Sequence, residues 1–258
     1  MPPVIYEKKG RTAYITINRP RAMNAFNAEV WQLLNESWIE ADRDPDVWSV
    51  IVTGAGDKSF SSGIDLKEAW QLIEKDTTAT QQWPSVTPMT GLPMSKPVIA
   101  AIAGYCIGTG PELALTCDIR IAAENAVFSM TEAQLGRVPA MGCTQRLPRQ
   151  VPFAAALEIL LTGEPINAQE AYRIGLVNKV VPLDKLMSTA EAYAERFNQN
   201  GPLAMRAIKE AAYRGLEMSL ADGIRFESIT GHNIRQTEDS REGPRSFVEK
   251  RKPVYKGK

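Results

Sequence analysis

One stretch of the chain, residues 96–112 (KPVIAAIAGYCIGTGPE), restricts the possible folds more than any other part of the sequence. It begins with a continuous apolar run, Val98–Ala103, which is typical of a strand buried on both faces. A glycine-rich segment follows, and Pro111 then signals the start of a helix, because a proline there loses no intrahelical hydrogen bond. The stretch therefore predicts a buried strand, a glycine-rich turn and a helix with Glu112 in its first turn.

This arrangement has a chemical consequence at the start of the predicted helix. The first N–H groups of a helix have no partner within it, and they favour negative charge. Beside Glu112, such groups can hold a developing oxyanion next to an acid/base group. A similar unit stands earlier in the chain, where the predicted buried strand Trp48–Thr53 leads through two glycines to the segment 60–66. The strand–glycine turn–helix unit therefore occurs twice.

The order of the predicted elements indicates an α/β fold. Strands alternate with helices up to about residue 182, and helices alone follow. We therefore expect a core domain, residues 1–200, and a C-terminal helical region, residues 201–258. Glycine and proline predict irregular structure in 135–147 and an interruption of the last helix at Gly243-Pro244.

Composition excludes several classes of protein. The chain has 258 residues, with 30 Lys and Arg against 30 Asp and Glu, so no overall basic charge favours nucleic acid. No apolar run approaches the ~20 residues that cross a bilayer. The N-terminus lacks the pattern of a secretion signal, and the irregular spacing of the three cysteines favours reduced thiols. We expect a cytoplasmic protein without membrane or nucleic-acid partners.

Common catalytic motifs are absent from the sequence. The glycines near Thr109 lack the spacing of a dinucleotide fingerprint, and GAGDKS at 54–59 lacks the spacing of a P-loop. There is no GxSxG and no HExxH. His232 is the one histidine and is expected on the surface, so a structural zinc site is not predicted.

Two glycine turns and two carboxylates remain as candidates. The turns can present the backbone N–H groups of Ile64 and Thr109, and the carboxylates are Glu112 and Glu132. Two N–H donors suit a thioester whose carbonyl oxygen gains charge, and two glutamates suit the addition of water across the adjacent double bond. The residues alone leave a simpler interpretation open, in which Glu112 complements a helix terminus and Glu132 is a surface acid.

The chain resembles the enoyl-CoA hydratase/isomerase (crotonase) superfamily over almost its whole length. The resemblance lies, in the family's order, in INRP with Met23-Asn24-Ala25, FSSGIDLKE, KPVIAAIAGYCIGTGPELALTCDIRIA, GRVPAMGCTQRLPR, TGEPINAQEAYRIGLVNKVVP and TEDSREGPRSFVEKRKP. It implies a spiral of repeated ββα units with a C-terminal α-helical trimerisation region. It also implies a homotrimer or a hexamer built as a dimer of trimers.

The resemblance assigns roles to the candidate residues. The N–H groups of Ile64 and Thr109 would form an oxyanion hole for a 2-enoyl-CoA thioester. Glu112 would activate water, and Glu132 would donate a proton to the α-carbon. No metal and no cofactor are expected, since the substrate itself carries coenzyme A.

Further residues follow from the same resemblance. Those expected near coenzyme A are Arg21, Ala22, Met23, Ile64, Asp65, Leu66, Lys67 and Thr109, with Phe247 and Lys250 approaching it across a subunit boundary. Those expected along the acyl group are Trp70, Trp83 and Met141, although buried packing in the core is at least as good an interpretation for each of the three.

Other functions within and beyond the superfamily stay open. A double-bond isomerase needs the same oxyanion hole but only one carboxylate, so the presence of both Glu112 and Glu132 favours a hydratase. A non-catalytic member that binds CoA esters or RNA is the third alternative. The family usually has alanine at the position of Ile64 and glycine at that of Thr109, which leaves the acyl substrate open.

Overall fold

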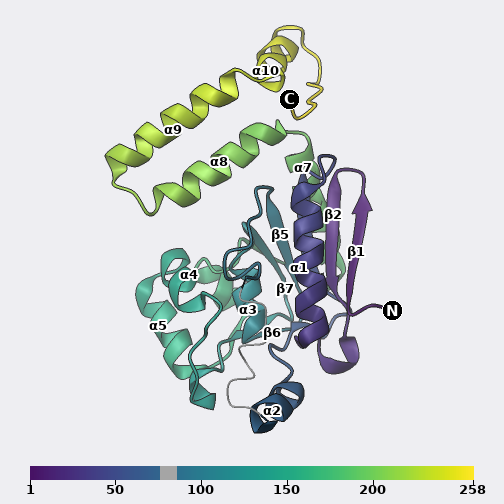
Figure 1. Ribbon diagram of the computed structural model, residues 1–258, viewed down its shortest axis with the longest axis vertical. Coiled ribbons are helices and arrows are strands. Elements are labelled where there is room, and N and C mark those ends of the chain that lie inside the picture. The colour runs from purple at the N-terminus through teal and green to yellow at the C-terminus, as the bar shows by residue number, and fades with distance from the viewer. Residues whose placement is uncertain (76–85) are drawn as a thin grey trace.

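The computed structural model describes residues 1–75 and 86–258, and it contains two β-sheets with helices around them (Figure 1). The larger sheet has the strand order β1-β2-β3-β5-β7-β10. Its strands are β1 (Val4–Lys9), β2 (Thr12–Ile17), β3 (Ser49–Gly54), β5 (Val98–Ile102), β7 (Ile119–Ala123) and β10 (Lys179–Val181). β1 and β2 form an antiparallel hairpin, and the other pairs are parallel.

The smaller sheet has the order β4-β6-β8-β9. Its strands are β4 (Ser59–Ser61), β6 (Tyr105–Ile107), β8 (Val127–Ser129) and β9 (Ile166–Asn167). Successive strands along the chain therefore enter different sheets, as in β3 and β4 or β5 and β6. This repeated strand–strand–helix order confirms the predicted α/β spiral.

The glycine-rich segments are not simple turns, so that part of the prediction is wrong. Each holds a short strand of the smaller sheet, β4 in the first unit and β6 in the second. Gly104 lies between β5 and β6 with a φ of 61°, and a Cβ there would collide with the backbone carbonyl of Lys58. The chain can thus leave one sheet and enter the other within a few residues.

Ten α-helices are described. They are α1 (Ala28–Arg43), α2 (Leu66–Lys75), α3 (Thr109–Ala114), α4 (Cys143–Gln150), α5 (Phe153–Thr162), α6 (Ala168–Arg173), α7 (Leu186–Asn198), α8 (Pro202–Gly215), α9 (Leu220–Arg235) and α10 (Glu238–Val248). Short 3-10 turns lie at Pro20–Ala22, Ala133–Leu135 and Leu183–Lys185. Asn27 caps α1, and its side chain accepts a hydrogen bond from the N–H of Val30 at 3.0 Å.

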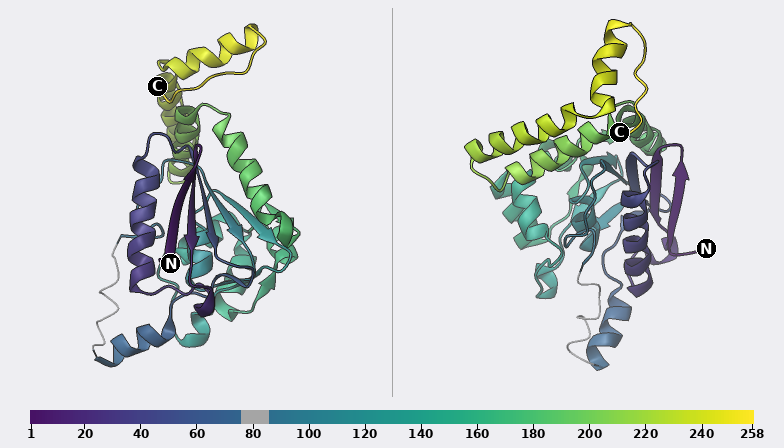
Figure 2. Two further views of the ribbon diagram at one scale, coloured as in Figure 1. Left: turned by 90° about the vertical axis from the view of Figure 1, so that its right-hand side faces the viewer. Right: turned by 45° about the horizontal axis from the view of Figure 1, so that its top comes forward.

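Helices α1 and α7 cover opposite faces of the larger sheet (Figure 2). In β5, Val98 and Ala100 pack on the side of α1, whereas Ile99 and Ala101 pack on the side of α7. Both faces of the strand are therefore removed from water, which explains its unbroken apolar sequence.

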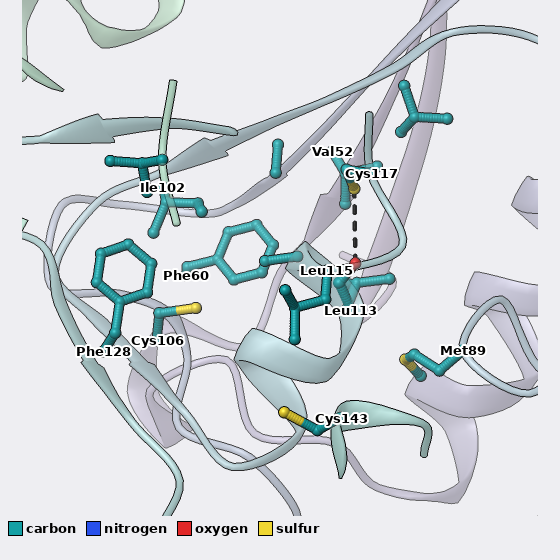
Figure 3. Close-up of a cluster of buried hydrophobic side chains, with 14 of the residues drawn as sticks. Val52, Phe60, Met89, Ile102, Cys106, Leu113, Leu115, Cys117, Phe128 and Cys143 are labelled. Carbon is teal, nitrogen blue, oxygen red and sulfur yellow. Dashed lines mark hydrogen bonds between the residues drawn. The ribbon is translucent and has the colours of Figure 1, made fainter. Parts of the chain in front are cut away.

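The three cysteine thiols are free and buried, as expected. Figure 3 shows Cys106, Cys117 and Cys143 among apolar side chains around Leu113 and Leu115 of the α3 region. Burial raises the pKa of the Cys117 thiol to about 12. These thiols are therefore protonated packing groups at neutral pH.

Residues 136–142 lie outside helices and strands, as predicted, but the prediction of irregular structure is wrong for 143–147, and so is the prediction of an interruption in the last helix. Residues 143–147 belong to α4, which begins after Gly142, a residue with a φ of 91°. α10 continues through Gly243-Pro244. The C-terminal tail contacts α10 immediately before this pair, where the Glu242 carboxylate accepts hydrogen bonds from Arg251 and from the N–H of Val254.

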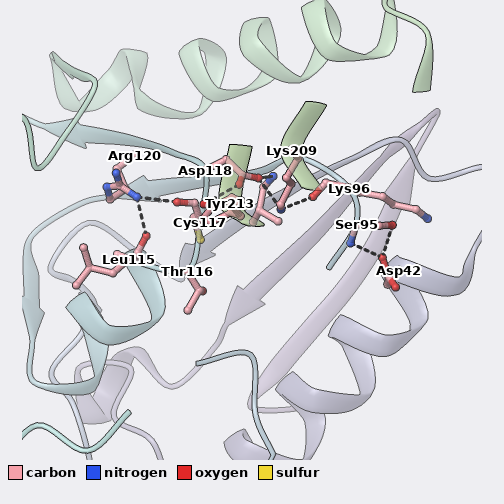
Figure 4. Close-up of polar contacts among 12 residues, drawn as sticks. Asp42, Ser95, Lys96, Leu115, Thr116, Cys117, Asp118, Arg120, Lys209 and Tyr213 are labelled. Atoms are coloured by element: carbon pink, nitrogen blue, oxygen red, sulfur yellow. Dashed lines mark hydrogen bonds and ion pairs between the residues drawn. The ribbon is translucent and has the colours of Figure 1, made fainter. Parts of the chain in front are cut away.

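The helices α8, α9 and α10 lie beyond one end of the sheets (Figure 1). α9 packs along α8, and α8 is joined to the core by polar contacts (Figure 4). Lys209 Nζ lies 2.8 Å from Asp118 Oδ2 and donates to the carbonyl of Lys96, also at 2.8 Å. Tyr213 donates its hydroxyl proton to Asp118 at 3.0 Å. Among the described helices, none has both the length and the hydropathy needed to cross a membrane.

Candidate active site

The two glycine turns of the sequence meet in space. Gly63 has a φ of 90°, and a Cβ placed on it would lie 3.0 Å from the carbonyl oxygen of Ile107 and 3.4 Å from the backbone nitrogen of Thr109. Gly108, with a φ of 57°, lies against the Cα of Gly63 in the same way. The turn after β4 and the turn after β6 therefore touch through backbone atoms, which requires glycine at both positions.

The backbone N–H groups of Ile64 and Thr109 are available at this junction. Ile64 forms a parallel bridge with Phe26, in which Gly63 O accepts from the N–H of Phe26 and Asp65 donates to Phe26 O. In a parallel bridge the N–H of the central residue points to the opposite side. Thr109 is the first residue of α3, so its N–H has no partner within the helix. Neither N–H has a backbone acceptor in residues 1–75 and 86–258.

Glu112 lies one turn into α3 and is 3% exposed. Its Oε1 accepts a hydrogen bond of 2.8 Å from the backbone N–H of Met141. Burial raises the pKa of Glu112 to about 7, and the charge of Glu132 adds to this rise, while the Met141 N–H opposes it. Glu112 is therefore a buried carboxyl group that exchanges its proton near neutral pH.

Glu132 reaches the same junction from the other side. It follows β8 and precedes the turn Ala133–Leu135. Its Oε1 lies 3.2 Å from the position of a Cβ on Gly108, and its buried Oε2 has no hydrogen-bond partner among the described residues. Burial raises the pKa of Glu132 as well. The fold thus brings together both predicted glutamates and both predicted N–H donors.

Two residues beside the glutamates, Cys143 and Arg146, were not predicted, and a third, Met141, was predicted only along the acyl group. Met141 supports Glu112 through its backbone N–H, and the carbonyl of Met141 accepts from Arg146 at 3.1 Å. Arg146 lowers the pKa of Glu112, though less than burial raises it. Burial raises the pKa of the Cys143 thiol most, and both carboxylates add to this rise. A backbone N–H exists at almost every residue, so no sequence signal distinguishes that of Met141.

The segments predicted to contact coenzyme A lie next to each other. Arg21 is exposed, whereas Ala22 and Met23 are half-buried. Met23 O accepts from the N–H of Ser62 at 3.0 Å, which joins this segment to the turn that contains Ile64. The exposed Leu66 and Lys67 begin α2 beside that turn.

The side chain of Asp65 forms an ion pair with another residue of the chain. Its Oδ2 lies 3.0 Å from Nη2 of Arg19, and both side chains are half-buried. Arg19 also donates to the carbonyl of Ala25 at 2.7 Å. Because the neighbouring residue is Ile64, this ion pair fixes the turn that presents its N–H. The INRP segment contains Arg19, but the pairing with Asp65 spans 46 residues and was not predicted.

The remaining predicted residues are dispersed. Trp70 is 58% exposed on α2, which excludes the alternative that it packs in the core. Met141 is half-buried at the glutamates, and Trp83 lies outside the described residues. Phe247 is 85% exposed, and Lys250 is also exposed; both lie at the α10 end, away from α3 (Figure 1). One chain alone therefore does not bring these two residues to the glutamates.

Among the residues that the structure describes, neither a cluster of metal ligands nor a histidine lies at this site. Within the described ranges, no three His, Cys, Asp or Glu side chains gather in a way that could hold a metal ion. His232 is exposed near the end of α9, as predicted.

Comparison with known proteins gives a consistent result. A family model described as enoyl-CoA hydratase/isomerase matches residues 7–258. The (E)-benzylidenesuccinyl-CoA hydratase of Thauera aromatica is 42% identical over 255 residues, covering 99% of each chain. The short-chain-enoyl-CoA hydratase of Clostridium acetobutylicum is 41% identical over 253 residues, covering 96% of this chain and 95% of that one.

Solved structures agree with these sequence relatives. The crystal structure of enoyl-CoA hydratase from Bacillus anthracis matches with a TM-score of 0.95 at 37% identity, covering 99% of this chain and 100% of that one. Enoyl-CoA hydratase EchA1 from Mycobacterium marinum matches with a TM-score of 0.90 at 34% identity, with full coverage of both chains. With its sequence, its two-sheet spiral and its C-terminal helices in agreement, the chain belongs to the enoyl-CoA hydratase/isomerase family.

Proposed function

We propose that this protein is a lyase that adds water to the double bond of a 2-enoyl-CoA thioester, or removes it in the reverse direction. The observation that carries the proposal is the pair Glu112 and Glu132, a buried and a half-buried carboxyl group with raised pKa values, beside two available N–H donors. The names of the relatives from Thauera aromatica and Clostridium acetobutylicum, both hydratases of CoA thioesters, support it.

The first requirement of the reaction is to stabilise the negative charge that develops on the thioester oxygen. The thioester oxygen accepts hydrogen bonds from the N–H groups of Ile64 and Thr109, which stabilise the negative charge that builds there as the α-carbon becomes enolate-like. Each donor of this kind contributes about 3–4 kcal/mol to transition-state stabilisation. The β-carbon thereby becomes susceptible to attack by water.

The two glutamates divide the proton transfers. Glu112 takes a proton from water as its oxygen bonds to the β-carbon, and Glu132 delivers a proton to the α-carbon. A carboxylate with a pKa of about 7 is a stronger base than an ordinary glutamate, and burial beside a second acid allows the other group to keep its proton. Water supplies both added hydrogens and the oxygen, so the reaction balances without a metal or redox cofactor.

We also propose that subunits of this chain complete one another's coenzyme A site. Several large apolar side chains on α8 to α10 are exposed in the single chain, among them Ile208, Leu216, Leu220, Ile229 and Phe247. Contact between copies would cover such residues. The trimer or dimer of trimers implied by the family resemblance would carry Phe247 and Lys250 to a neighbouring site.

An activity screen tests the proposed reaction. Purified protein is incubated with straight, branched, aromatic and cyclic 2-enoyl-CoAs, and loss of the conjugated thioester absorbance is followed. We expect turnover with at least one acyl class. Gain of conjugation from 3-enoyl-CoA, with none of the 2-enoyl compounds hydrated, would instead identify an isomerase. Binding of CoA esters or RNA without turnover would identify a non-catalytic member.

A further inference from the structure

The side chain of Thr109 has an unexplained property. It is 1% exposed, and its hydroxyl oxygen Oγ1 is buried without a hydrogen-bond partner in the part of the chain that the structure describes. Buried hydroxyl groups almost always have a partner, because leaving one unsatisfied forfeits the hydrogen bonds that it made with water. An unsatisfied hydroxyl inside a candidate active site therefore points to a partner that arrives with the substrate.

The position of Thr109 identifies that partner. Its nitrogen lies 3.4 Å from the Cβ position of Gly63, at the junction where the thioester oxygen is proposed to bind. In two of the three staggered χ1 rotamers of threonine, Oγ1 is gauche to the nitrogen of the same residue. A single acceptor atom can then receive both the N–H and the O–H of Thr109. A glycine or alanine at this position would offer the N–H alone.

We infer that Thr109 donates its hydroxyl proton to the thioester oxygen as a third hydrogen bond, in addition to the N–H groups of Ile64 and Thr109. The inference rests on the proposed function, since it assigns a further donor to the same oxyanion. No bond is made or broken by the hydroxyl. It binds the carbonyl oxygen in the ground state and more strongly as that oxygen becomes negative.

Three variants isolate the hydroxyl from the backbone. Thr109→Val keeps the shape and the N–H but removes the O–H, and Thr109→Ser restores the O–H. Thr116→Val is the matched control, because the Thr116 hydroxyl, just beyond the C-terminal end of α3, already donates to Leu113 O at 2.7 Å. Thr116 has no role in the proposed reaction.

If the inference is correct, Thr109→Val lowers kcat without lowering Tm. Thr109→Val lowers kcat for crotonyl-CoA, or for the best substrate of the screen, by about 10- to 100-fold, whereas Thr109→Ser stays within about threefold of wild type. The Tm of Thr109→Val is unchanged or higher, because an unsatisfied buried hydroxyl has been removed. Thr116→Val keeps its kcat and loses Tm. A fall of the Tm of Thr109→Val as large as that of Thr116→Val would show that the hydroxyl is bonded within the protein and overturn the inference.

A spectroscopic measurement separates this inference from the proposed reaction. Butyryl-CoA labelled with carbon-13 at the carbonyl cannot be hydrated, and its bound C=O stretch falls in frequency with each hydrogen bond to the oxygen. We expect a smaller fall with Thr109→Val than with wild type or Thr109→Ser. If wild type hydrates no enoyl-CoA, the proposed function fails. The C=O frequencies of bound butyryl-CoA still show, in that case, whether the Thr109 hydroxyl donates to the thioester oxygen. Equal frequencies in wild type and Thr109→Val, or an altered pH profile without a frequency change, would assign the hydroxyl elsewhere and overturn the inference.

Discussion

The carboxylate of Glu112 accepts a hydrogen bond of 2.8 Å from the backbone N–H of Met141, which ties α3 to the segment before α4 across 29 residues. This contact favours the ionised form of Glu112, whereas burial and the nearby Glu132 favour the protonated form. Burial dominates, and the pKa rises to about 7. The balance leaves a buried acid that can both release and accept a proton near neutral pH.

The pH dependence of hydration should report this balance. Because Glu112 must be ionised to take a proton from water, we expect kcat/KM to fall as the pH drops below about 7. Glu132→Gln cannot ionise, so any contribution of a Glu132 charge to the pKa of Glu112 is lost, and the acid limb of its residual activity should lie at or below that of wild type. The profile is measured at several pH values between 5 and 9. An acid limb near pH 4.5 in wild type would mean that burial does not raise the pKa of the essential base.

Glu112→Gln should stabilise the folded protein at alkaline pH. The pKa of Glu112 is higher in the folded than in the unfolded chain, so its protonated form contributes stability that is present below pH 4.5 and lost as the pH rises through about 7. This difference corresponds to about 3 kcal/mol at full ionisation. Glutamine resembles the protonated acid, and we expect Glu112→Gln to exceed wild type by about 1–3 kcal/mol at pH 8 but not at pH 4.5. Chemical denaturation at the two pH values measures this, and an equal or lower stability at pH 8 would contradict it.

Breaking the ion pair of Arg19 and Asp65 should impair catalysis through Ile64. The pair spans 3.0 Å between half-buried side chains and holds the turn that presents the Ile64 N–H. We expect Asp65→Asn to lower stability by about 1–2 kcal/mol and kcat by about tenfold, because charge-assisted contacts are the stronger ones and donor placement affects rate. Asp184→Asn is the control, since its pair with Lys185 is exposed, and its effect should lie within about 0.5 kcal/mol. Unchanged kcat in Asp65→Asn would show that Ile64 does not depend on the pair.

Lys250 should matter for the nucleotide part of coenzyme A and only in the assembled protein. We expect Lys250→Ala to raise KM for an enoyl-CoA by about 2- to 5-fold, the size of one exposed charge contact. KM for the corresponding pantetheine thioester, which lacks the nucleotide, should not change. Lys252→Ala is the neighbouring control. Sedimentation analysis should give a trimer or hexamer, and a fully active monomer would contradict the proposed sharing of sites.

Much of the fold follows from local pattern, and the failures have specific causes. The apolar run Val98–Ala103 correctly predicts β5. Its side chains are apolar on both faces because α1 and α7 cover both faces of the strand. The interruption predicted at Gly243-Pro244 does not occur. Arg251 and Val254 of the C-terminal tail hydrogen-bond to Glu242 of α10, and these residues lie outside the local pattern from which the interruption was predicted. A local pattern contains no information about such distant support.

The same limit applies to the site. Motifs and family resemblance identify Glu112 and Glu132, since carboxylates are chemically distinct side chains. They do not identify the Met141 N–H, which any residue at that position except proline would supply, or the Arg19–Asp65 pair, whose partners meet only after β4 and the 19–26 segment come together. The unpartnered hydroxyl of Thr109 becomes visible only when its surroundings are known.

Isotope incorporation with the two glutamate variants tests the central claim most directly. Crotonyl-CoA is hydrated in deuterium oxide enriched in oxygen-18, and the product is analysed by mass spectrometry. With wild type we expect oxygen-18 at the β-carbon and one deuterium at the α-carbon. Glu112→Gln and Glu132→Gln should each form this product at least about 1,000-fold more slowly while still binding butyryl-CoA. Wild-type rates of hydration in either variant would contradict a mechanism in which these two carboxyl groups transfer the protons.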